Sequence, residues 1–109
     1  MGIQTFRHKG LRKFYETGSK AGILPKLASK IALVLDRLDA ASDIRDMNFP
    51  GSNFHSLKGE LKDFFSVHVN DNWVIIFRFE KSDAFDVDLV DYHLGGLCEK
   101  KKENQRIQE

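Results

Sequence analysis

Two histidines, a lysine and a tyrosine are the side chains of this chain best suited to acid–base chemistry. His55 and Lys58 lie close together in the sequence, and Tyr92 and His93 are consecutive. An imidazole can take or give a proton near neutral pH, an ammonium group can stabilise charge on a phosphate, and a phenol can donate a hydrogen bond to a phosphate oxygen. The set therefore suits metal-free cleavage of RNA, in which the 2′-hydroxyl loses a proton and the leaving 5′-oxygen gains one. Either imidazole can serve as the base.

The same side chains also have purely structural interpretations. His55 can be a loop histidine, and Tyr92 can be an aromatic side chain packed at the end of a strand. The predicted strands raise a geometric objection as well. In an up-down-up meander, the first strand begins at the end of the sheet opposite to the end where the third strand finishes. His55 and His93 can meet only if the loop that carries His55 folds back across the sheet.

No pattern in the sequence predicts a metal or cofactor site. The four histidines include no pair three or four residues apart, and the single cysteine adds little to a zinc site. Asp86 and Asp88 share a strand face, which an exposed, soluble edge explains. Gly95 and Gly96 precede no helix of the kind that binds phosphate. We therefore expect neither a metal nor a cofactor.

The spacing of apolar residues predicts the helices that must support these groups. A short strand is expected at residues 3–6. A first helix then ends at Gly18, because glycine commonly follows the last helical residue. A second helix, with one apolar stripe, is expected from about Pro25 to Ala41.

Three strands are expected after this helical region. Apolar and polar residues alternate over 61–69 and again near 85–89, where Phe85, Val87 and Leu89 are expected to share one face. Residues 73–77 are apolar on both faces, which is typical of a central strand. The element order β-α-α-β-β-β predicts an α+β fold in which two N-terminal helices pack on an antiparallel sheet.

The composition is that of one soluble globular domain. The chain has 109 residues, of which 41% are hydrophobic and 30% are charged, and its formal net charge is +1. One cysteine excludes an internal disulfide framework and fits a reducing compartment. The sequence contains no apolar run long enough to span a bilayer and begins with no signal peptide, so we expect a cytoplasmic protein without a membrane partner.

The net charge conceals a strong gradient along the chain. Residues 1–37 hold eight basic and two acidic residues, a net charge of +6, whereas the remainder holds nine basic and fourteen acidic residues, a net charge of −5. The gradient permits an RNA-facing surface on a nearly neutral protein. Its alternative interpretation is two helices whose lysines simply solvate an exposed face.

Four stretches of the sequence together resemble the HigB branch of the RelE-like toxins, the killer proteins of bacterial toxin–antitoxin modules. The resemblance implies a microbial RNase-like fold and a ribosome-dependent mRNA endonuclease that inhibits translation and is neutralised by a helix-turn-helix antitoxin of the HigA type. The stretches are Phe6-Arg7-His8-Lys9-Gly10-Leu11, His55-Ser56-Leu57-Lys58-Gly59, Asn72-Trp73 followed by Ile75-Ile76-Phe77-Arg78-Phe79, and Asp91-Tyr92-His93.

The resemblance also assigns roles to individual residues. His55 and His93 are the candidates for proton transfer, Lys58 would stabilise phosphate charge, and Tyr92 would orient the phosphate. Asp91 and Arg78 fall on further substrate positions. The basic residues at the start of the chain would contact ribosomal RNA phosphates in a salt-dependent way; they are Arg7, Lys9, Arg12 and Lys13.

The sequence departs from the family pattern in two places. The family usually carries Arg after its Asn-Trp pair, where this chain has Val74, so a catalytically weak or inactive homologue that binds an antitoxin or a ribosome is the alternative function. An unrelated small α+β binding module is the third hypothesis. The family commonly ends near its Tyr-His pair, so we expect one toxin domain over residues 1–93 and a polar extension over residues 94–109.

Overall fold

The structure is a computed structural model that describes residues 2–70 and 72–91. The predicted site residues Tyr92 and His93 and the predicted extension 94–109 lie outside the described residues. Within the described ranges, no helix is long and apolar enough to cross a membrane. The elements are β1 (Gly2–Ile3), α1 (Lys9–Thr17), α2 (Ala28–Ala40), β2 (His55–Ser56), β3 (Phe64–His68), β4 (Trp73–Glu80) and β5 (Asp83–Asp91), with 3₁₀ turns at Pro25–Leu27, Ile44–Met47 and Gly59–Leu61.

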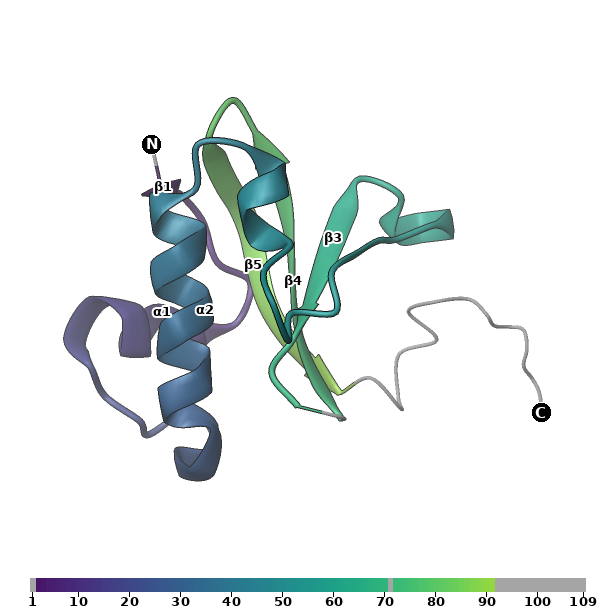
Figure 1. Ribbon diagram of the computed structural model, residues 1–109. Helices are drawn as coiled ribbons and strands as arrows, with labels where there is room; N and C mark the ends of the chain where they lie inside the picture. Colours follow the sequence, from purple (N-terminus) through teal and green to yellow (C-terminus); the bar gives the residue numbers. More distant parts are fainter. Residues whose placement is uncertain (1, 71, 92–109) are drawn as a thin grey trace.

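The five strands form one sheet in the order β1-β5-β4-β3-β2 (Figure 1). Strands β3, β4 and β5 pair antiparallel, as predicted, and β4 is the predicted central strand. Strand β2 was not predicted: it lies in a segment expected to be a loop, and it pairs antiparallel with β3. The expectation of a purely antiparallel sheet is wrong in one respect, because β1 pairs parallel with β5. The sheet is therefore mixed, and both helices lie on one side of it, which confirms the α+β class.

The two helices begin and end where the sequence places them, to within a few residues. The Nδ1 of His8 accepts a hydrogen bond of 3.0 Å from the backbone of Leu11 and so caps α1. Gly18 ends α1 with a φ of 80°, a conformation that glycine adopts without strain. The predicted second helix starts with a 3₁₀ turn at Pro25, and its α-helical part begins at Ala28.

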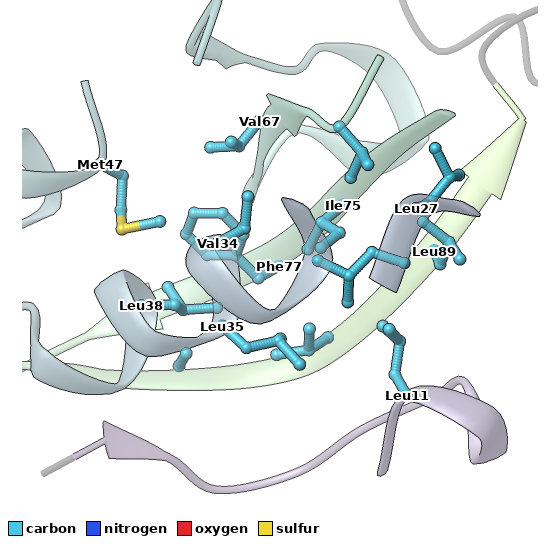
Figure 2. Close-up of a cluster of buried hydrophobic side chains, with 14 of the residues drawn as sticks. Leu11, Leu27, Val34, Leu35, Leu38, Met47, Val67, Ile75, Phe77 and Leu89 are labelled. Atoms are coloured by element: carbon cyan, nitrogen blue, oxygen red, sulfur yellow. The ribbon is translucent and has the colours of Figure 1, made fainter. Parts of the chain in front are cut away.

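The main core lies between α2 and one face of the sheet (Figure 2). Val34 and Leu38 of α2 are fully buried, and they face Phe77 on the central strand. Burial of each such side chain stabilises the fold by about 1.5–3 kcal/mol. The core therefore fixes one face of the sheet against the helices and leaves the other face for a site.

Strand β5 departs from the predicted alternation at a β-bulge. The pairing of β4 with β5 shifts between Ile76 and Arg78, and Asp86 has a φ of 55°. Val87 and Leu89 face the helices, but Phe85 pairs with Arg78 on the opposite face. The expectation that Phe85 shares a face with Val87 and Leu89 is therefore wrong, because the bulge inserts one extra residue into β5 and so shifts the alternation.

Candidate active site

The sheet face opposite the helices, here called the second face, carries a small apolar patch of its own. The patch consists of Leu57, Phe64, Val74 and Ile76, all of which are buried, with Leu61 and Val90 packed against them. Strands β3 and β4 supply Phe64, Val74 and Ile76, the connection between β2 and β3 supplies Leu57 and Leu61, and β5 supplies Val90. The exposed polar residues of the candidate site lie beside this buried apolar patch.

The segment that carries His55 folds back along the edge of the sheet. Strand β2 runs antiparallel to β3, so that His55 pairs with Ser66 in the middle of β3. The backbone N–H of Leu57 extends this pairing with a hydrogen bond of 2.9 Å to the carbonyl of Phe64. His55 thus shares a cross-strand row with Ser66, Ile76 and Asp88, on the edge strand that β3 and β4 separate from β5. His93, which the geometric objection concerns, lies outside the described residues.

The environment of His55 determines which ring nitrogen carries its proton. The Nδ1 atom lies 2.9 Å from the backbone carbonyl of Asn53, and the side chain is exposed. A carbonyl oxygen can only accept a hydrogen bond, so Nδ1 must be the protonated nitrogen of the neutral ring. The lone pair is then on Nε2, which is the arrangement required of a general base.

Lys58 lies beyond β2, near the start of β3. It is exposed and directly precedes the 3₁₀ turn at Gly59–Leu61, where Gly59 has a φ of 71°. The structure thus brings His55 and Lys58 into one hairpin, which carries these residues away from the helices (Figure 1).

Asp91 lies at the other end of the sheet, where it pairs with Trp73. The rows of Phe64 and Asp91 are five positions apart along β4, which is roughly 17 Å. Asp91 is therefore distant from Lys58, whereas the positions of Tyr92 and His93 relative to this hairpin lie outside the described residues.

Arg78 is held by acidic neighbours on the second face. Its guanidinium donates to Asp86 at 2.9 Å and to Glu80 at 3.1 Å, and it lies 5.4 Å from the ring centroid of Phe85. The hydrogen bond to Asp86 raises the pKa of Arg78 above its ordinary value. Two carboxylates therefore compensate the charge of this predicted substrate-binding residue.

Val74 lies four residues before Arg78 on β4 and so shares the second face with it, but Val74 is fully buried. It packs in the apolar patch with Phe64 and Ile76. At the position where the family usually has an arginine, this chain thus has an apolar side chain that belongs to the buried patch.

The four predicted RNA-binding residues near the start of the chain divide into two groups. Lys9, Arg12 and Lys13 are exposed on α1, where Arg12 pairs with Glu16 at 3.2 Å. Arg7 precedes the helix, and its guanidinium lies over the ring of Phe64 on the second face, 5.0 Å from the centroid. These residues therefore do not form one surface.

His68 is a further imidazole on the second face that the sequence does not single out. It pairs with Val74 and lies two residues beyond Ser66, so it is a diagonal neighbour of His55. The alternation of Phe64, Ser66 and His68 is the signal that places it there. Among residues 2–70 and 72–91, no group of three His, Cys, Asp or Glu side chains is arranged to hold a metal ion.

Comparisons with known proteins assign the family. A family model described as the RelE-like toxin of type II toxin–antitoxin system HigB matches residues 4–93. Endoribonuclease HigB of Proteus vulgaris is 34% identical over 91 residues, which cover 84% of this chain and 99% of that protein. Toxin HigB-1 of Vibrio cholerae is 33% identical over 86 residues, which cover 77% of this chain and 90% of that protein.

A solved structure agrees in fold. The solution structure of the conserved hypothetical protein HP0894 from Helicobacter pylori has a TM-score of 0.51 and 15% sequence identity, and the match covers 85% of this chain and 96% of that chain. At this identity the likeness concerns the fold alone, whereas the family assignment rests on the sequence matches. This chain belongs to the HigB-like family of RelE-like toxins of type II toxin–antitoxin systems.

Proposed function

We propose that this toxin is an endoribonuclease that cleaves messenger RNA on the ribosome and so inhibits translation. The relative from Proteus vulgaris named Endoribonuclease HigB supports the activity. The observation that carries the proposal is the hydrogen bond between His55 and the Asn53 carbonyl, which leaves Nε2 of an exposed imidazole available as a base.

The proposed reaction is an intramolecular phosphoryl transfer assisted by two proton transfers. Nε2 of His55 takes the proton of a 2′-hydroxyl, and the 2′-oxygen attacks the adjacent phosphorus. The bond to the 5′-oxygen breaks, and His93 gives that oxygen a proton, so the products are a 2′,3′-cyclic phosphate and a 5′-hydroxyl. Lys58 stabilises the negative charge that develops on the phosphate oxygens, and Tyr92 orients the phosphate.

The proposed partners follow from the family and from the charge gradient. A type II toxin acts with an antitoxin, and we propose a helix-turn-helix antitoxin of the HigA type. The exposed cations of α1 would hold ribosomal RNA through its phosphates, and the ribosome would present the message in the cytoplasm.

Induced expression tests the proposal. The wild type should arrest growth and create new messenger 5′ ends, whereas His55→Ala and His93→Ala should do neither. Ser56→Ala is the matched control, because Ser56 is exposed on the same short strand and should leave cleavage intact. Normal growth and an unchanged map of 5′ ends for the wild type would rule out the nuclease function.

Buried Val74 supports the alternative function, a homologue that binds its antitoxin or the ribosome without efficient cleavage. The discriminating variant is Val74→Arg, which returns a guanidinium to the second face. If the alternative is correct, this variant cleaves messages that the wild type leaves intact. If the wild type already cleaves them, the alternative is excluded.

A further inference from the structure

We propose that Arg7 binds a phosphate group of the message next to the cleaved linkage, rather than ribosomal RNA at the surface of α1. This inference rests on the proposed endoribonuclease function and assigns a substrate contact within it. The observation behind it is the contact between Arg7 and Phe64, which are distant in the sequence. Arg7 follows β1 at one edge of the sheet, whereas Phe64 lies on β3, near the other edge.

The backbone of Arg7 lies against β5, but its side chain reaches β3. The N–H of Arg7 donates to the carbonyl of Val87 at 2.8 Å, and the preceding residue, Phe6, packs against the helix-side core. The guanidinium carbon lies 5.0 Å from the ring centroid of Phe64. Because β4 separates β5 from β3, the side chain must cross the second face over the central strand.

This path brings Arg7 close to the proposed catalytic hairpin. Phe64 is a diagonal neighbour of His55 across the β2–β3 pair, which places their Cβ atoms within roughly 7–8 Å. The carbonyl of Phe64 accepts the N–H of Leu57, the residue before Lys58. Arg7 and His55 therefore lie beside one aromatic residue on the same face of the sheet, and Lys58 follows the residue that pairs with it, although Arg7 and this hairpin are about fifty residues apart in the sequence.

The charge of Arg7 is available to a ligand. Its side chain is exposed, and it makes no ion pair within the part of the chain that the structure describes, whereas Arg78 on the same face binds two carboxylates. An arginine fork can bind phosphate through two parallel hydrogen bonds. The cation–π contact with the ring of Phe64 uses no N–H of the guanidinium in a hydrogen bond, so these donors are available to a phosphate.

The test compares two arginines that make the same kind of contact. Arg7→Met keeps an unbranched side chain over Phe64 and removes the charge. Arg37→Met is the matched control, because the Arg37 guanidinium lies 4.6 Å from the ring centroid of Phe49 on the helix side. Both variants are assayed for cleavage of a ribosome-bound message at a saturating toxin concentration, for co-sedimentation with ribosomes, and for thermal unfolding.

We expect Arg7→Met to cleave roughly 10- to 100-fold more slowly, the effect of losing a hydrogen bond to a charged group. Ribosome co-sedimentation and the melting temperature should change little, and Arg37→Met should cleave like the wild type. Wild-type cleavage by Arg7→Met would overturn the assignment, and so would a loss confined to ribosome binding. If the wild type cleaves nothing, the proposed function fails and this assignment fails with it.

A modified message identifies the phosphate. Methylphosphonate linkages, which carry no charge, replace the phosphates flanking the cleaved linkage one at a time. At the linkage that Arg7 binds, the wild type should slow to the rate of Arg7→Met, and the variant should slow no further. Equal additional slowing of both proteins at every flanking linkage would exclude a direct contact with those phosphates and overturn the assignment.

Discussion

The hydroxyl of Tyr15 donates a hydrogen bond of 2.7 Å to Oδ1 of Asp39, which also accepts the backbone N–H of Ile3 at 3.1 Å. A single carboxylate oxygen therefore joins α1, α2 and β1. This junction fixes the start of the chain, from which Arg7 reaches the second face.

Removal of this carboxylate should destabilise the fold. We expect Asp39→Ala to lower the free energy of unfolding by about 1–2 kcal/mol, because the half-buried N–H of Ile3 loses its acceptor. Asp36→Ala, an exposed position on the same helix, should change it by less than about 0.5 kcal/mol. Urea unfolding measures both, and equal stabilities for the two variants would contradict this role of Asp39.

The same hydrogen bond should raise the pH at which the hydroxyl of Tyr15 loses its proton. The bond to Asp39, with partial burial and the charges of Asp39 and Glu16, raises the pKa of Tyr15 to about 12 from an ordinary value of 10.0. Since the folded-state pKa is the higher one, the stabilisation is complete below pH 10 and is lost as the pH rises towards 12. The effect is modest, because the side chain is 39% exposed.

Ultraviolet absorbance reports this ionisation directly. A Tyr92→Phe variant leaves Tyr15 as its single tyrosine. Its tyrosinate absorbance should appear near pH 12, and adding Asp39→Ala should move the titration towards pH 10. A midpoint near 10 with Asp39 intact would show that the bond does not persist in solution.

Two glycines at opposite ends of α1 should differ in their tolerance of a methyl group. A Cβ on Gly10 would collide with the backbone of Gly22, whereas a Cβ on Gly18 would have no neighbour within 4 Å. We expect Gly10→Ala to cost more than about 3 kcal/mol, because two backbones must separate. Gly18→Ala should cost about 1 kcal/mol, for the positive φ alone. Similar melting temperatures for the two variants would contradict the close packing of Gly10 on Gly22.

Charge reversal on α1 should separate ribosome binding from folding. Arg12→Glu with Lys13→Glu should weaken co-sedimentation with ribosomes and reduce its salt dependence, because phosphate contacts release counterions. Stability should change little, since the Arg12–Glu16 pair is exposed. Lys81→Glu, in the β4–β5 turn, should bind normally. Unchanged sedimentation of the α1 variant would exclude this surface.

The elements with local signals were predictable from the sequence. Gly18 ends a helix because of its own backbone freedom, and the apolar residues of β4 require a central strand wherever the rest of the chain goes. The bulge at Asp86 has no such signal. Thr5 causes part of it, since its hydroxyl accepts the N–H of Asp86 and its carbonyl accepts the N–H of Val87. These bonds join segments about eighty residues apart, and local periodicity does not report them.

In the candidate site, too, some features have local sequence signals and others depend on contacts between distant segments. Residue type and spacing nominate His55 and Lys58 as site residues, but the tautomer of His55 depends on the path of the backbone at Asn53, where φ is 49°. The position of Arg7 was harder to foresee, because a basic residue beside a basic helix is expected to join that helix's surface. Only the sheet order shows that its side chain can reach Phe64.

The place of β5 in the sheet has a consequence for the timing of synthesis. β5 is made after β1 to β4, yet it lies between β1 and β4 and is the strand with which β1 pairs. A growing chain that has not reached residue 83 therefore has an unpaired first strand, and until residue 87 is made Arg7 lacks the Val87 carbonyl to which its N–H donates. A chain of this topology therefore completes its sheet only after β5 has been made.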